Sequence, residues 1–178
     1  RSQLWWDVPV IDSYQLLRDI YRVPGQKYQK RLCELTDALA LGDFLHTPLR
    51  LLSLGQRMRA ELGGSLLHSP KLLFLDEPTI AQDVRGRRRI AEIVRTLSQR
   101  GKLVLAILHD MDFVAECFER VIVMAQGRVV AEGTPRRVFS DAEALQAARL
   151  DPPHVTQLCT RLGYEGVFLT VEEFLHAC

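Results

Sequence analysis

The sequence has few of the features that mark membrane, secreted and nucleic-acid-binding proteins. None of its apolar runs approaches the roughly 20 residues needed to cross a bilayer, and its start carries no charged-then-apolar signal segment. The net charge is only +1, and the single dense basic run, residues 85–89, has no interleaved aromatic residues. We therefore expect no nucleic-acid partner, and any membrane role must come through another subunit.

Cysteines are few and widely spaced. Cys33, Cys117, Cys159 and Cys178 have neither metal-binding nor redox spacing, which favours reduced thiols in a cytoplasmic protein. With 47% hydrophobic and 25% charged residues in 178, the composition is that of a soluble globular piece with one domain.

Two acids end an apolar run. Residues 72–75 are Leu-Leu-Phe-Leu, and Asp76 and Glu77 follow directly. An aspartate at the carboxyl end of a buried strand lies in the crevice where open α/β sheets bind ligands, and in phosphoryl-transfer sites it holds magnesium. The neighbouring acid can position water. The ordinary alternative is a strand that ends in acids before a loop.

A glycine-bearing turn precedes this strand. Ser53 and Gln56 have the spacing of a capping box that opens a helix running toward His68. Gly55 leaves the backbone approachable, and a helix N-terminus of this kind can bind a phosphate. The box alone is compatible with a purely structural role. Residues 63–64, both glycine, each cost about 1 kcal/mol relative to alanine inside that helix, so we expect it to be soft there.

The rest of the pattern alternates helix with strand. Apolar residues between 90 and 97 repeat with a helical period, residues 103–108 form a buried strand that ends before His109, and residues 121–124 and 129–131 flank Gln126-Gly127 as a hairpin. This alternation predicts a layered α/β domain. Parallel pairing of the two buried strands would bring Asp76 and His109 to one crevice.

The first fifty residues are predicted to be helical. Tyr14 and Leu17 share one helical face, Tyr28 and Leu39 share another, and Pro24-Gly25 breaks the chain between them. Core packing is the favoured role for the tryptophans at 5 and 6, and contact with a membrane subunit is the alternative. A second capping box, Thr170 to Glu173, opens a helix in the tail.

Four of these segments together resemble the ATPases of ABC transporters. Residues 52–56 resemble the signature motif, usually Leu-Ser-Gly-Gly-Gln, with Leu54 in place of the first glycine. Residues 72–77 resemble Walker B, residues 81–83 (Ala-Gln-Asp) lie where the family has its D-loop, and His109 lies where it has its switch histidine. Taken singly, Asp83 would be a helix N-cap and His109 a capped strand end.

The resemblance implies a role for each segment. Asp76 would bind Mg²⁺, Glu77 would polarise the attacking water, and His109 would contact the terminal phosphate of ATP. The nucleotide-binding residues, with ATP held by the opposite subunit, would be Ser53, Leu54, Gly55, Gln56 and Asp83.

The family's phosphate loop, Gly, four residues, Gly-Lys-Ser/Thr, does not occur in these residues. The only Gly-Lys pair, Gly101-Lys102, is followed by Leu103. The family's spacing puts the Q-loop glutamine just before Arg1, which makes Gln3 a poor substitute. We therefore expect a carboxyl-terminal portion of a longer ATPase, inactive by itself, with part of its sheet uncovered.

The predicted fold class is α/β, an incomplete P-loop NTPase-like layered domain with an α-helical signature subdomain. We expect a helical subdomain over 1–69, an α/β core over 70–140 and a helical tail over 141–178. Residues 4–79 resemble an exporter-type group, whereas the chain from His109 onward resembles energy-coupling-factor importers, which leaves the direction of transport open.

The expected partners are a second ATPase subunit, in a homo- or heterodimer, and a transmembrane permease at the cytoplasmic face of the membrane. Two alternatives remain. The chain could be a non-catalytic module that completes a partner's ATP site, or a soluble ABC ATPase acting on ribosomes or DNA.

Overall fold

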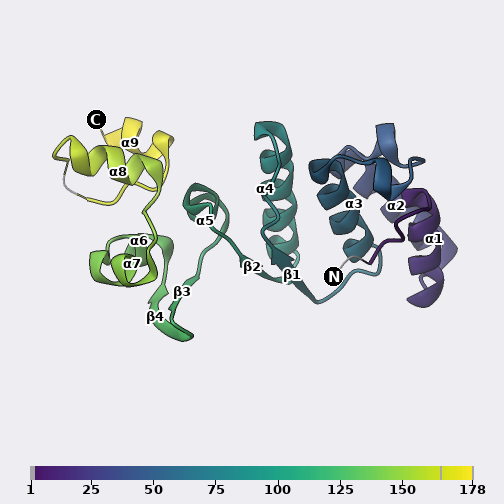
Figure 1. Cartoon of the computed structure of the whole chain (residues 1–178), viewed down its shortest axis with the longest axis horizontal. Coiled ribbons are helices and arrows are strands. Elements are labelled where there is room, and N and C mark those ends of the chain that lie inside the picture. The colour runs from purple at the N-terminus through teal and green to yellow at the C-terminus, as the bar shows by residue number, and fades with distance from the viewer. Residues whose placement is uncertain (1–2, 165, 178) are drawn as a thin grey trace. The chain divides into compact units, whose positions relative to one another are not determined.

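The computed structural model describes residues 3–164 and 166–177 of the chain. The chain forms two compact units, Arg1–Ile107 and Leu108–Cys178, whose elements are labelled in Figure 1. Within the described part, no helix is long and apolar enough to span a membrane.

The first unit begins with a cluster of three α-helices (Figure 1). The predicted helices and the break between them are confirmed: α1 and α2 lie on either side of Pro24, and the capping box opens α3. Two short 3-10 helices, η1 and η2, connect α2 to α3. The bounds are α1 (Val10–Ile20), α2 (Gly25–Leu39), η1 (Gly42–Phe44), η2 (Leu49–Leu51) and α3 (Leu54–Leu66).

Helix α3 is continuous through its two glycines because α1 packs against them. The hydroxyl of Tyr14 donates a hydrogen bond to the carbonyl of Ala60 at 2.7 Å. A Cβ on Gly63 would lie 2.2 Å from the Tyr14 hydroxyl oxygen, and one on Gly64 would lie 3.0 Å from Leu4. Burial raises the pKa of Tyr14, which keeps this hydroxyl protonated as a donor. Close packing against Tyr14 therefore leaves no room for a side chain at Gly63, and the packing at Gly64 is tight.

The expectation that the two tryptophans pack into the core is wrong. Trp5 is 44% exposed and Trp6 is 51% exposed, while Leu4 beside them is buried. The guanidinium of Arg57 lies 4.4 Å from the centroid of the Trp6 ring, so a cation–π contact holds this ring at the surface.

The α/β part of the first unit consists of β1 (Leu72–Asp76), α4 (Val84–Gln99) and β2 (Leu103–Ile107). The strands pair in parallel, from Leu72 with Leu103 to Asp76 with Ile107, as the alternation of helix and strand predicts. Buried apolar residues of α4 cover one face of this pair. The other face is exposed; Phe74, for example, is 67% accessible.

The second unit is built around a β-hairpin. The predicted hairpin is confirmed, with β3 and β4 antiparallel and both Gln126 and Gly127 in the left-handed region, as a tight two-residue turn requires. Short helices enclose a small core that includes Val123 and Phe139. The bounds are α5 (Met111–Cys117), β3 (Val121–Ala125), β4 (Arg128–Gly133), α6 (Pro135–Phe139), α7 (Ala142–Ala148), α8 (His154–Arg161) and α9 (Val171–Ala177).

Candidate functional site

The turn before α3 forms the predicted capping box. The backbone N–H of Gln56 donates to the Ser53 hydroxyl at 3.3 Å, and the backbone N–H of Ser53 donates to the Gln56 side-chain oxygen at 2.9 Å. Ser53 and Leu54 are exposed, while Gly55 and Gln56 are half-buried. The backbone amides at this helix start are thus presented from a turn whose geometry is fixed by two reciprocal hydrogen bonds.

The two acids occupy different environments at the end of β1. Asp76 is the last residue of the strand and is exposed, whereas Glu77 is half-buried. Glu77 has a φ of 47°, and its backbone bonds to Ile107 (N···O 3.0 Å) and Ile80 (O···N 3.1 Å). A left-handed conformation costs an L-residue about 1–2 kcal/mol, and these contacts hold the Glu77 backbone in it at a defined place beyond the sheet.

The segment that follows Glu77 contacts the turn before α3. The Gln82 side-chain nitrogen donates to the Gly55 carbonyl at 3.0 Å. A Cβ on Gly55 would lie 2.6 Å from the carbonyl oxygen of Ala81, so a glycine is required at this approach. The structure thereby joins two segments that the sequence predicted separately. The sequence placed Gln82 in the segment that resembles the D-loop but predicted no role for its side chain, because no local pattern indicates the contact with Gly55.

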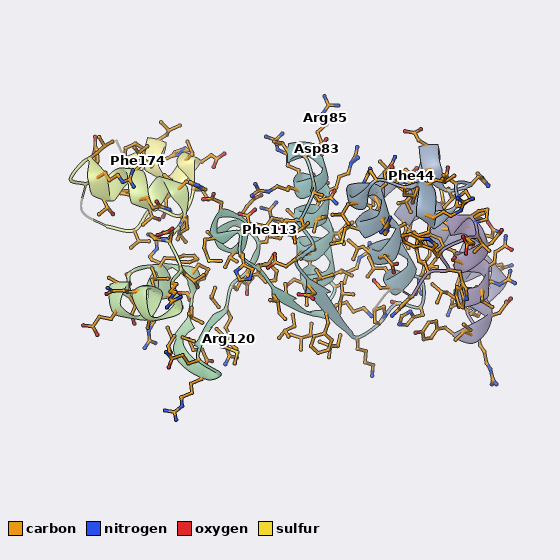
Figure 2. The ribbon with its side chains drawn as sticks, in the orientation of Figure 1. Phe44, Asp83, Arg85, Phe113, Arg120 and Phe174 are labelled. Carbon is orange, nitrogen blue, oxygen red and sulfur yellow. The ribbon has the colours of Figure 1, made fainter. Side chains whose placement is uncertain are left out.

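Asp83 is the N-cap of α4, as expected of it when taken singly. Its carboxylate accepts the backbone N–H of Gly86 at 2.6 Å. Figure 2 shows it at the start of that helix, with the Arg85 side chain extending away from the helix. Asp83 therefore fixes where α4 begins, next to the Gln82 contact.

His109 belongs to the second unit. It is exposed and precedes α5, whose N-cap Asp110 accepts the backbone N–H of Phe113 at 3.0 Å. The parallel pairing that would bring Asp76 and His109 together is confirmed as far as Ile107, the partner of Asp76. The proximity of the two side chains stays a prediction, because it spans the two units.

Asp76 suits a magnesium ion that arrives with a nucleotide. Among the described residues, no group of three or more His, Cys, Asp or Glu side chains could hold a metal by itself. Magnesium in nucleotide sites is commonly bound by one or two carboxylates together with substrate phosphates. One exposed carboxylate at the carboxyl end of β1 would be the protein's contribution to such a site.

Comparison with known proteins agrees with these motifs. A family model described as ABC transporter matches residues 6–80. The energy-coupling factor transporter ATP-binding protein EcfA1 of Symbiobacterium thermophilum is 38% identical over 161 residues, which cover 87% of this chain and 56% of that protein. The cobalt import ATP-binding protein CbiO of Salmonella typhimurium is 34% identical over 154 residues, 86% of this chain and 56% of that protein.

The chain belongs to the ABC transporter ATP-binding proteins. A solved ATP-binding subunit of an ABC transporter matches it with a TM-score of 0.73 at 19% identity, over 91% of this chain and 65% of that one. This likeness confirms the P-loop NTPase fold. The chain spans 56% of the length of each of the two relatives named above.

The matched family region contains the capping-box turn, Asp76 and Glu77. Asp83 and His109 lie beyond it. The roles that the resemblance implies for individual side chains remain proposals for this ABC protein.

Proposed function

We propose that this chain is an ATP-binding and ATP-hydrolysing subunit of an ABC transporter, and that it couples ATP hydrolysis to transport of a solute across a membrane. The observation that carries the proposal is the contact of Gly55 with Ala81 and Gln82. This contact joins the turn that resembles the signature motif to the segment directly after the two acids. A displacement of one segment would therefore displace the other.

The capping-box turn is proposed to contact the phosphates of ATP held by an opposite subunit. Its start is exposed, and Gly55 removes a side chain from the backbone at the point of closest approach. Because Gln56 already closes the box through its side-chain oxygen, its side-chain nitrogen is the group oriented toward a ligand. Leu54, 48% exposed, contributes its backbone amide there.

Asp76 and Glu77 are proposed to have different roles in ATP hydrolysis. Asp76 would hold Mg²⁺, which when bound neutralises phosphate charge during phosphoryl transfer. Glu77, held beyond the strand by its backbone bonds, would orient and deprotonate the attacking water. His109 would donate a hydrogen bond to the terminal phosphate, and Asp83 would hold the D-loop segment in place at the start of α4.

The phosphate-loop pattern does not occur in these 178 residues, which alone are proposed to be inactive. The active form is proposed to be a dimer of ATP-binding subunits, docked on a permease at the cytoplasmic face of the membrane. One relative is named as a cobalt import protein, which favours uptake as the direction of transport.

A second candidate function is a non-catalytic module that lends Ser53 to Gln56 to a partner's ATP site. The exposed start of the capping-box turn is the observation behind it. The two functions differ in what Glu77 does. A module that only completes a neighbour's site has no need of this carboxylate.

Glu77→Gln in the native transporter assembly tests the proposal. Loss of a general base lowers turnover by about 10²- to 10⁴-fold, so we expect hydrolysis to fall by at least about 100-fold with ATP affinity unchanged. Glu92→Gln, at an exposed position on α4, is the matched control and should turn over normally. Unchanged hydrolysis in Glu77→Gln would favour the non-catalytic module.

A further inference from the structure

We propose that Gln82 is a positioning residue, which holds the capping-box turn at Gly55 in register with the segment after Glu77. This inference rests on the proposed function for its catalytic consequence. Its structural content stands on the geometry of the first unit alone. Gln82 is half-buried, and its carboxamide lies between two glycines, Gly55 on one side and Gly86 on the other.

The nitrogen end of the carboxamide contacts the turn. It donates to the Gly55 carbonyl at 3.0 Å, and a Cβ on Gly55 would lie 3.4 Å from it. This carbonyl lies in the first turn of α3, immediately before Gln56. The bond therefore fixes the peptide unit that the proposed function presents to a phosphate.

The oxygen end of the carboxamide lies against the second glycine. A Cβ on Gly86 would lie only 2.4 Å from the Gln82 side-chain oxygen. Alanine in the first turn of α4 would favour the helix by about 1 kcal/mol over glycine. A glycine within this run of arginines is thus explained by the space that the carboxamide needs.

The backbone of Gln82 is also fixed. Its N–H donates to the Thr79 carbonyl at 3.2 Å, Ala81 before it has a φ of 55°, and Asp83 after it caps α4. The side chain accordingly projects from a rigid turn. Displacement of residues 79–83 by a partner or a nucleotide would pull on Gly55 through a single hydrogen bond.

Hydrogen–deuterium exchange on the native assembly tests this directly. Gln82→Leu keeps the approximate size of the side chain and removes the donor, and Gln99→Leu makes the same change at an exposed position of α4. We expect amide exchange across residues 54–57 to rise about fivefold in Gln82→Leu, because one hydrogen bond is lost, and to stay unchanged in Gln99→Leu.

Gly86→Ala should disrupt the hydrogen bond between Gln82 and Gly55 in a second way. The added methyl group displaces the Gln82 oxygen, so this variant should also raise exchange at residues 54–57 although it alters neither Gln82 nor Gly55. In a Gln82→Ala background the obstructing oxygen is gone and the Asp83 carboxylate oxygen, 3.1 Å from the new Cβ, is the nearest remaining atom, so Gly86→Ala should add little further exchange. Additive effects of the two changes would contradict the proposed arrangement.

ATP turnover separates this inference from the proposed function. A positioning role predicts a lower kcat for Gln82→Leu with KM for ATP unchanged, because Gln82 itself is not proposed to contact ATP. Unchanged exchange at residues 54–57 in Gln82→Leu overturns the hydrogen bond itself. Raised exchange with unchanged kcat overturns the positioning role. An unsubstituted assembly without ATP turnover defeats the proposed function and leaves the exchange result intact.

Discussion

Two helices of this protein begin with the same kind of capping pattern, and the structure completes the pattern differently in each. At Ser53 the box closes on itself, because Gln56 bonds back to the backbone of Ser53. At Thr170 the hydroxyl accepts the N–H of Glu173 at 3.2 Å, but the Glu173 carboxylate accepts the N–H of Leu169 at 2.8 Å, one residue earlier.

Neighbouring residues account for the difference. Glu173 also pairs with Arg136, which in turn donates to the carbonyl of Val167, so the tail box is drawn into a network of the second unit. The box at Ser53 is uncharged and has Gly55 where the tail has the exposed Glu172. A capping pattern thus predicts where a helix starts. Whether that helix start has only a structural role or is a candidate ligand site depends on its tertiary contacts.

Gly55→Ala should produce the largest difference in stability between the two capping boxes. The new Cβ meets a backbone oxygen, that of Ala81, at 2.6 Å, and overpacking of this kind costs about 1–3 kcal/mol. Chemical denaturation should register the loss, together with loss of ATP turnover. Glu172→Ala, at the equivalent exposed position of the tail box, should change neither quantity. A Gly55→Ala variant as stable as the parent would contradict the close approach.

Removal of the hydroxyl cap from each box should distinguish the two boxes by their effect on ATP hydrolysis. Ser53→Ala and Thr170→Ala each delete one cap and should each cost about 1 kcal/mol of unfolding free energy. Only Ser53→Ala should also slow ATP hydrolysis, because only that turn is proposed to contact nucleotide. The measurement is denaturant unfolding alongside steady-state turnover, and equal slowing by both variants would argue against a special role for Ser53.

Acidification should separate the two boxes by the smallest margin. The N–H of Leu169, and secondarily Arg136, lowers the pKa of Glu173 below its usual value. A depressed pKa stabilises the folded state above the unfolded pKa, and this contribution is lost as pH falls through the folded pKa. Amide exchange at residues 170–174, corrected for the pH dependence of the intrinsic exchange rate, should therefore rise as the pH falls through the folded-state pKa of Glu173, and the lost protection is about 0.5 kcal/mol for a solvent-accessible pair.

The same acidification should leave residues 53–56 unaffected, since none of Ser53, Leu54, Gly55 and Gln56 is titratable. Glu173→Gln should abolish the pH dependence at α9 while Glu172→Gln retains it. A parallel loss of protection in both boxes would indicate a general loosening of the chain rather than the titration of Glu173.

Local patterns predicted much of the fold. The strand that ends in Asp76, the parallel strand at 103–107, the hairpin at Gln126 and the box at Ser53 all follow from periodicity or turn chemistry within a few residues. Family membership followed from the order of such segments along the chain.

The sequence did not predict contacts between residues that lie far apart in the chain. The pair of glycines in α3 suggested a soft helix, whereas Tyr14 packs against them. The sequence predicts Trp6 in the core, whereas Arg57 holds it at the surface. Gln82 lies in the segment that resembles the D-loop, but no local pattern predicts its contact, because the partner is Gly55, a residue far from it in the chain.

The most direct test of the account is amide exchange of residues 52–57 in the Glu77→Gln assembly, with and without ATP and magnesium. If the turn at Ser53 closes on a nucleotide that cannot be hydrolysed, its exchange should slow when ATP is added, while exchange at residues 170–174 stays constant. Bound ATP with no change in exchange at residues 52–57 would contradict the claim that this turn completes an ATP site.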